Sequence, residues 1–340
     1  MAQTHILSIG TALPGPPIDN PALCKRIGAQ PEWIDLFVGT RTRHFSVDFE
    51  TGEQTHTLAD LAASAARQAL TRADVDPGEV GFLVLGTATP DYLMPTTANL
   101  VADTLGLNQI PTFQLQSGCS GAIAAFEVGA RMLDEDRRIG LVLGGDRCFK
   151  HLPLDRDTSS AMSPSELINF VLFGDGAGAA VLSLDPDGAQ LQITSLINQF
   201  RGLGRERGQL VNWFGTADRH LDLPGLQEDY KAIEKWVPEL SKEVLSALLQ
   251  TAGVAREDLD FLLPPQLSGR MTERIVQHMG PAANCKEISV VADTGNTSNA
   301  LPFLQLDELV QTIRPGENAA VVAIESSKWI EGGMMVEAVA

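Results

Sequence analysis

Cys119 stands between Gly118 and Gly121, in the stretch "FQLQSGCSGAIAAFEVGARML" that covers residues 113–133. A cysteine can act as a nucleophile when its thiol loses a proton. The N-terminus of a helix carries about half a positive charge, which favours the thiolate. A lone cysteine can also be a buried structural residue. The two flanking glycines, which permit a tight entry into a helix, favour the nucleophile.

The pattern around Cys119 predicts the elements that position it. Residues 113–116 fit an extended segment, and from Ala122 onward apolar residues recur at helical spacing (Ile123, Phe126, Val128, Ala130 and Leu133). Elsewhere short, continuous apolar runs alternate with helical patterns. This alternation predicts an α/β fold with largely parallel strands that are buried on both faces.

An internal duplication organises the whole chain. Three pairs of segments correspond in the same order, the first two with an offset of 179 residues and the third with 177: 69–86 with 248–265, 139–148 with 318–327, and 117–122 with 294–299. We therefore predict two similar halves, residues 1–185 and 186–340, each with a sheet covered by helices. Because no Pro/Ser-rich linker separates them, the two halves should pack tightly together.

Composition restricts the class of protein. The 340 residues carry a net charge of −18, which argues against nucleic acid or an anionic membrane as the main partner. The four cysteines are isolated and no histidine lies near them at metal-ligand spacing, so we expect reduced thiols and no metal site. The N-terminal residues do not resemble a signal peptide and no apolar run reaches 18 residues. We expect a soluble, cytoplasmic protein.

Several strings along the chain are similar to motifs of one enzyme family. They are "PEWIDLFVGTRTRHF" (31–45), "TATPDYLMPTTANLVADTLGL" (87–107), "SGCSGA" (117–122), "FGDGAGAAVL" (173–182) and "GNTSNA" (295–300). Together they resemble the ketoacyl-ACP synthase III group of condensing enzymes, in the thiolase superfamily. The resemblance implies a thiolase-like fold in which each half has a mixed sheet covered by helices, and it implies a homodimer and catalysis by Cys119 and Asn296. It also implies acyl-CoA or acyl carrier protein as the substrate, with no further cofactor.

One expected catalytic residue is missing. The family carries a histidine in a "PHQAN"-like string, but here the string reads "FLLPPQLSGRM" (261–271) and Pro265 takes the histidine's position. In a decarboxylating condensation, the histidine and asparagine side chains stabilise the enolate. Loss of one such donor typically costs about 2.7–4 kcal/mol. Gln266 can donate hydrogen bonds but does not titrate, and we nominate none of the six histidines as the base.

The C-terminal loop departs from the family too. The family usually has a glycine-rich turn that supplies one N–H group of the oxyanion hole, but this chain has "IESSKWIEGGMM" (324–335). We expect the backbone N–H groups of Cys119 and Ser327 to form the hole, in a shape altered by Glu325.

Two further residues match positions that bind substrate in the family. Trp33 matches a tryptophan that stacks on the coenzyme A adenine, although it could instead pack at the rim of the fold. Met94, just before Pro95, falls where family members insert a side chain into the acyl pocket of the partner subunit; it could equally be a core methionine. We expect Trp33, Met94 and Gln266 to bind substrate.

The sequence leaves three functions open. The leading hypothesis is an acyltransferase that moves an acyl group from a thioester, through acyl-Cys119, to a small acceptor in a specialised biosynthetic pathway. The alternative is a ketosynthase that forms a carbon–carbon bond, with Asn296 and either Gln266 or water replacing the histidine. The third is a non-catalytic subunit of a heterodimer, although retention of Cys119 and Asn296 argues against it.

Overall fold

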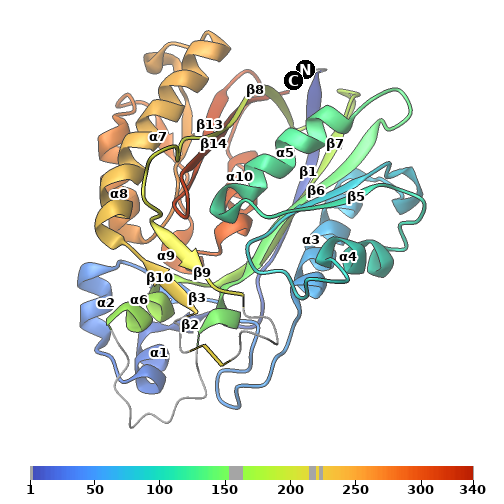
Figure 1. The fold of residues 1–340 in the computed structure, drawn as a ribbon. Helices are drawn as coiled ribbons and strands as arrows, with labels where there is room; N and C mark the ends of the chain where they lie inside the picture. Colours follow the sequence, from blue (N-terminus) through green and yellow to red (C-terminus); the bar gives the residue numbers. More distant parts are fainter. Residues whose placement is uncertain (1–2, 153–163, 214–219, 222–224, 340) are drawn as a thin grey trace.

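A ten-stranded mixed sheet runs through the computed structural model, which describes residues 3–152, 164–213, 220–221 and 225–339 (Figure 1). The strand order is β12-β11-β13-β14-β8-β1-β7-β6-β4-β5. The strands of the first half are β1 (Thr4–Ala12), β4 (Leu83–Gly86), β5 (Thr112–Leu115), β6 (Ile139–Arg147) and β7 (Asp175–Ser183). Those of the second half are β8 (Leu191–Phe200), β11 (Phe261–Leu263), β12 (Lys286–Glu287), β13 (Asn318–Glu325) and β14 (Ile330–Ala338).

The two halves repeat one strand order. Reading from the middle of the sheet outward, β1-β7-β6-β4-β5 corresponds to β8-β14-β13-β11-β12. The corresponding strands β6 and β13 begin at Ile139 and Asn318, as the offset of 179 residues predicts. The α/β fold with two similar halves is therefore confirmed, whereas the boundary at residues 185/186 stays a prediction.

The sheet differs from the sequence expectation in two respects. Only β4 and β11 pair with both neighbours in parallel; the central strands β1, β7, β8 and β14 run antiparallel. The expectation of largely parallel strands is thus wrong, because a continuous apolar run reports burial on both faces and not strand direction. The mixed sheet that the family resemblance implies is confirmed. In addition, β1 pairs with β8, Thr4 opposite Ile193 and Ile6 opposite Leu191, so the two halves share one sheet.

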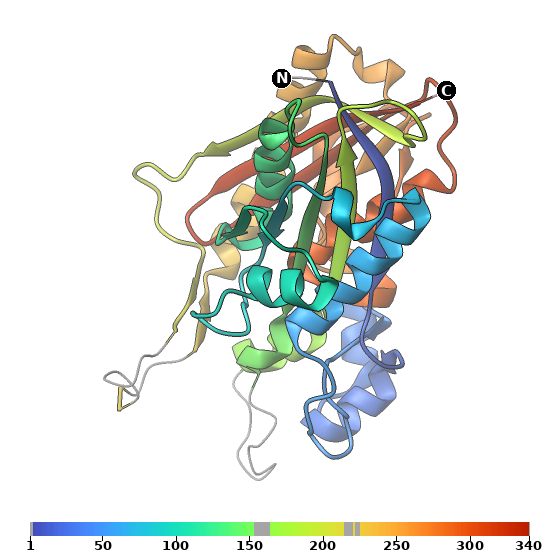
Figure 2. The same cartoon turned by 90° about the vertical axis from the view of Figure 1, so that its right-hand side faces the viewer.

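Helices form layers on both sides of the sheet (Figures 1 and 2). The outer helices are α3 (Leu58–Ala73) and α4 (Thr97–Leu105) over the first half, and α7 (Tyr230–Ala252) and α8 (Gly269–Met279) over the second. Between the halves lie α5 (Gly121–Met132) and α10 (Leu301–Val310). The rings of Phe126 and Phe303 join these two helices, with 5.1 Å between their centroids.

Smaller elements gather at the end of the molecule opposite the two termini (Figures 1 and 2). They are α1 (Asn20–Ile27), α2 (Pro31–Phe37), α6 (Pro164–Leu172), α9 (Val291–Thr294) and the two-stranded pairs β2 (Ile18–Asp19) with β3 (Thr42–Arg43) and β9 (Gln209–Val211) with β10 (Leu226–Glu228). Leu23, Ile34, Phe149 and Phe170 form their core. Within the described ranges, no helix has the length and apolar character needed to cross a bilayer.

Candidate active site

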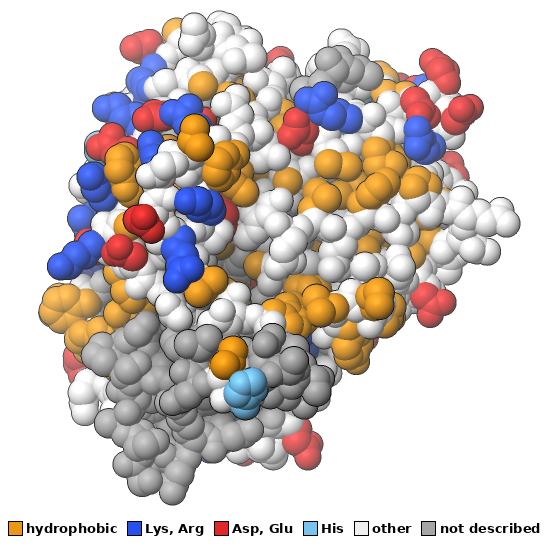
Figure 3. All heavy atoms as spheres, in the orientation of Figure 1, with side chains coloured by type: hydrophobic (Ala, Val, Ile, Leu, Met, Phe, Trp, Pro, Cys, Tyr) orange, Lys and Arg blue, Asp and Glu red, His pale blue; other side chains and the backbone are white. Residues whose placement is uncertain are grey.

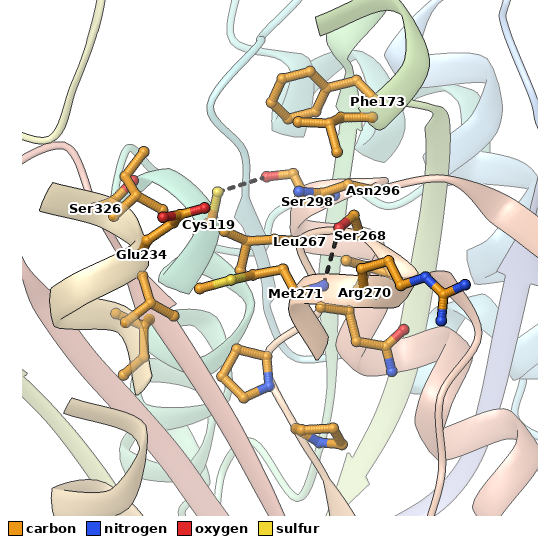
Figure 4. Close-up of a pocket in the computed structure, with 18 of the residues that line it drawn as sticks. Cys119, Phe173, Glu234, Leu267, Ser268, Arg270, Met271, Asn296, Ser298 and Ser326 are labelled. Atoms are coloured by element: carbon orange, nitrogen blue, oxygen red, sulfur yellow. Dashed lines mark hydrogen bonds between the residues drawn. The ribbon is translucent and has the colours of Figure 1, made fainter. Parts of the chain in front are cut away.

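A cavity of about 290 Å³ opens between the two halves and the smaller elements. Cys119 contributes to its lining from the first half, and Asn296, Ser298 and Ser326 from the second (Figure 4). Cys119 is only partly buried, so its sulfur is reachable from the cavity. The cavity is therefore a candidate site for a reaction at this cysteine.

Tight backbone packing places Cys119 at the entry of α5. The predicted strand and helix are present as β5 and α5, and a short 3-10 turn, η2 (Gly118–Ser120), joins the approach to the helix. Gly118 has a φ of +51°, in the left-handed region that favours glycine. A Cβ atom on Gly121 would lie 2.8 Å from the Asn299 side-chain oxygen. Both glycines are therefore required by the geometry.

Asn299 fixes this turn from the opposite half of the chain. Its side-chain oxygen accepts a hydrogen bond from the Ala122 N–H group (2.8 Å), and its amide donates to the Gly118 carbonyl (2.9 Å) and to Asp146 (2.7 Å). Ser120, which precedes α5, makes no such side-chain cap. Asn299 thus satisfies the first turn of α5, a role that sequence reasoning missed although the residue belongs to "GNTSNA".

Ser298 and Asn296 lie beside the Cys119 sulfur (Figure 4). The Ser298 hydroxyl donates to Cys119 Sγ at 3.5 Å. The Ser298 N–H group in turn donates to Asn296 Oδ1 at 2.9 Å, which fixes the orientation of the asparagine amide. The structure therefore brings the predicted pair Cys119 and Asn296 into one cavity. Ser298 is a further neighbour of the sulfur that the sequence analysis did not single out.

The surroundings of the Cys119 sulfur disfavour the thiolate and raise the pKa of the thiol. Burial is the main cause that raises its pKa well above the ordinary value, and the negative charge of Glu325 raises it further. The hydrogen bond from Ser298 acts in the opposite direction. The expectation that the helix N-terminus makes this sulfur anionic is thus wrong for the resting site, because desolvation and a nearby carboxylate oppose the helix dipole.

Glu325 occupies the position predicted for the oxyanion hole. Its carboxylate accepts hydrogen bonds from the backbone N–H groups of both Cys119 and Ser327, the latter at 2.5 Å. These are the two donors expected to bind a substrate oxyanion, and here they converge on a protein carboxylate. Glu325 is 1% exposed, and a Cβ atom on Gly118 would collide with its carboxylate.

Pro264, Pro265 and Gln266 also line the cavity. No histidine is among the described residues that line the cavity. The Gln266 side-chain oxygen accepts from the N–H groups of Val290 and Val291, and its amide donates to the Ile288 carbonyl at 3.2 Å. These bonds hold the 288–291 segment and argue against the prediction that Gln266 replaces the missing imidazole.

The two remaining predicted residues lie in different places. Trp33, on α2, lines the cavity together with Phe37, and their ring centroids are 6.4 Å apart. Arg270 and Arg274 of α8 also line it, and both guanidinium side chains are largely exposed. Met94 is not part of the cavity lining of this single chain and is 86% exposed. Substrate binding by Trp33 and Met94 stays a prediction.

All four cysteines are free. Within the ranges that the structure describes, no group of three or more histidine, cysteine or acidic side chains could hold a metal ion.

Comparisons with known proteins give a consistent picture. Residues 113–198 match the family description "3-Oxoacyl-[acyl-carrier-protein (ACP)] synthase III" and residues 249–327 match its C-terminal counterpart. A beta-ketoacyl-[acyl-carrier-protein] synthase III from Bradyrhizobium sp. is 32% identical over 91% of this chain and 90% of its own length. A solved structure described as "AbyA1 - tetronic acid condensing enzyme" is 48% identical, with a TM-score of 0.94 over 98% of this chain and 99% of that one. The priming beta-ketosynthase of the R1128 polyketide pathway is 25% identical over 99% of this chain and 96% of its own, with a TM-score of 0.81.

Proposed function

The chain belongs to the 3-oxoacyl-[acyl-carrier-protein] synthase III family, and from this premise we propose that it transfers an acyl group from a thioester, through acyl-Cys119, to a small acceptor. Members of this family are transferase or condensing enzymes that need no cofactor beyond their acyl-thioester substrate. The covalent intermediate at Cys119 and the nature of the acceptor are the new parts of the proposal.

The observation that carries it is the composition of the cavity around the sulfur. Cys119 is reachable, the Ser298 hydroxyl contacts it, and Asn296 is oriented beside it. Pro265, which the sequence resemblance aligns with the histidine of the family, lines the cavity. This arrangement retains a nucleophile but lacks one of the two side-chain donors for the enolate of a decarboxylating condensation. Acyl transfer to an acceptor that needs no decarboxylation fits it better.

The first partner must be a thioester carried by coenzyme A or by an acyl carrier protein. Trp33 and the cationic side chains of Arg270 and Arg274 flank the cavity. Figure 3 shows further lysine and arginine side chains on the left of the view, where α7 and α8 lie, in spite of the net charge of −18. These groups support the docking of an anionic donor here.

A second candidate is carbon–carbon bond formation with an already activated carbon nucleophile. The relative that is 48% identical is described as a tetronic acid condensing enzyme. A tetronic acid ring contains both a lactone C–O bond and an enolised β-dicarbonyl carbon, and neither bond requires malonyl decarboxylation. This likeness favours an acceptor in a specialised pathway that offers a hydroxyl group, an acidic carbon, or both.

Intact-protein mass spectrometry tests the proposal. The protein is incubated with acetyl, longer acyl and hydroxyacyl thioesters of coenzyme A and of a carrier protein. We expect one acyl group per chain in the wild type and none in Cys119→Ala, with Cys148→Ala as the matched control that still acquires it. If no thioester gives an adduct on the wild type, the carrier role is wrong and the non-catalytic subunit becomes the better hypothesis.

A further inference from the structure

The structure gives the Glu325 carboxylate an unusual set of neighbours. It accepts hydrogen bonds from the Cys119 and Ser327 N–H groups, packs against the bare backbone of Gly118, and is almost fully buried. A buried carboxylate is costly unless such donors compensate for its lost hydration. The chain therefore places an anion, held by its own backbone, within the proposed catalytic centre.

The position of this carboxylate creates a conflict that the reaction must resolve. When a thiolate attacks a thioester, the carbonyl oxygen becomes negative and needs the same two N–H donors. A second anion on these donors would repel the developing charge. The Glu325 carboxylate must therefore lose its charge, or leave, before the substrate oxygen can be stabilised.

We propose that Glu325 is the proton acceptor for the Cys119 thiol and that its protonation frees the oxyanion hole. This inference rests on the proposed acyl transfer and names the base that takes the place of the missing histidine. The Cys119 backbone N–H group donates to the Glu325 carboxylate, so the carboxylate lies next to the residue whose thiol must lose its proton. The proposed proton donor and acceptor thus belong to two residues that are joined through the Cys119 backbone.

The proposed step balances without another reactant. The S–H bond of Cys119 breaks and an O–H bond forms on Glu325, while the sulfur electron pair bonds to the thioester carbonyl carbon. A neutral carboxylic acid is a weaker hydrogen-bond acceptor than a carboxylate. The Cys119 and Ser327 N–H groups can therefore donate to the new oxyanion instead. When the intermediate collapses, the donor C–S bond breaks and the leaving thiolate takes the proton from Glu325.

Two rates measured on Glu325→Gln separate this role from a purely structural one. The amide keeps the size of the side chain but removes its charge and its basicity. Alkylation of Cys119 by iodoacetamide at neutral pH should become about 10-fold faster, since each unit by which the thiol pKa falls is a factor of ten. Acylation by an acyl thioester, followed by rapid-quench mass spectrometry, should become at least about 100-fold slower, as expected for loss of a general base.

Glu331→Gln is the matched control, because Glu331 is another buried carboxylate on the next strand, where Arg201 pairs with it at 3.4 Å. Both rates should stay near the wild-type values in this variant. If Glu325→Gln does not fold by circular dichroism, Glu325→Asp carries the same test and should change both rates in the same directions, by less.

The outcomes distinguish the two proposals. Equal or faster acylation in Glu325→Gln would overturn the base role alone and leave Glu325 as a mere occupant of the hole. Unchanged or slower alkylation would overturn it as well, because the carboxylate would then not be what disfavours loss of the thiol proton. A wild-type protein that reacts with iodoacetamide but with no thioester would instead overturn the proposed function itself.

Discussion

At the scale of single residues, the protonation of Cys119 decides how the site works. The thiol lies between one group that favours the thiolate, the Ser298 hydroxyl, and several that oppose it, chiefly burial and the Glu325 carboxylate. Substitutions at these neighbours should therefore move the reactivity of the sulfur in opposite directions.

Replacement of Ser298 by alanine removes the hydrogen bond that stabilises the thiolate. The pKa of Cys119 should rise further, so the alkylation rate at a fixed pH below that pKa should fall. A hydrogen bond to a charged group contributes about 1.5–3 kcal/mol, which corresponds to a decrease of about 10- to 100-fold. The measurement is the iodoacetamide rate as a function of pH, whose rise should shift to higher pH. Ser326→Ala, which alters another serine that lines the cavity, is the control; an equal profile for both variants would disprove the role of Ser298.

Replacement of Pro265 by histidine tests why decarboxylation should be weak here. If the missing imidazole is the reason, Pro265→His should raise carbon dioxide release from a malonyl thioester by about 10-fold or more, up to the 100- to 1000-fold effect of a single oxyanion donor. Pro264→His adds an imidazole to the neighbouring position and should not produce this gain. Equal release by both variants and the wild type would show that other differences in the cavity set the reaction.

At the scale of elements, Asn299 links the start of α10 to the start of α5. Its side chain is fully buried and serves Gly118, Ala122 and Asp146 at once. A residue at the start of α10 in the second half thus stabilises the turn before α5 in the first half, and this turn carries the nucleophile.

Asn299→Ala should destabilise the protein and disturb the Cys119 turn. It leaves the Ala122 N–H group and part of the Asp146 carboxylate without partners, and each such buried group costs about 1–3 kcal/mol. We expect a loss of about 2–4 kcal/mol in the free energy of unfolding, measured by urea denaturation. Asn284→Ala removes an exposed hydrogen bond to the Glu257 carbonyl and should cost less than about 0.5 kcal/mol. Similar losses in the two variants would contradict the linking role.

The sequence predicts the strand and helix that position Cys119, but it does not predict which charged groups surround the thiol. Local signals placed Cys119 before a helix, because glycine spacing and apolar periodicity depend on nearby residues. The carboxylate that raises its pKa comes from Glu325, 206 positions further along the chain, and its direction depends on packing. Likewise, the sequence identifies Gln266 as a candidate hydrogen-bond donor, but it does not predict that residues 288–291 take up its hydrogen bonds. Strand direction was misjudged because burial alone does not encode it.

At the scale of the whole molecule, one face is suited to a second copy of the chain. β5 is an edge strand, and Phe113 on it is 42% exposed. Nearby in the sequence, Leu93 and Met94 are 68% and 86% exposed, and Figure 3 shows apolar side chains gathered on the side where β5 lies. An exposed strand edge with apolar side chains is a common pairing surface. These features support the homodimer that the family resemblance implies.

Sedimentation velocity tests the assembly. The wild type should sediment with about twice the chain mass of 36.4 kDa at micromolar concentration. Met94→Asp should shift the distribution toward the monomer, because a carboxylate would be buried in the interface. Leu36→Asp alters a side chain that is 63% exposed on α2, away from β5, and should leave the dimer intact. A monomeric wild type, or equal dissociation of both variants, would rule out this interface.

The most direct test of the account is the chemical identity of the acylated atom. After a single turnover with an acyl thioester in the absence of acceptor, the protein is digested and the peptides are sequenced by mass spectrometry, with and without neutral hydroxylamine. We predict that the acyl mass lies on Cys119 and that hydroxylamine removes it, as expected for a thioester. An acyl group found only on another side chain, or one that resists hydroxylamine, would contradict the central claim that Cys119 carries the transferred group.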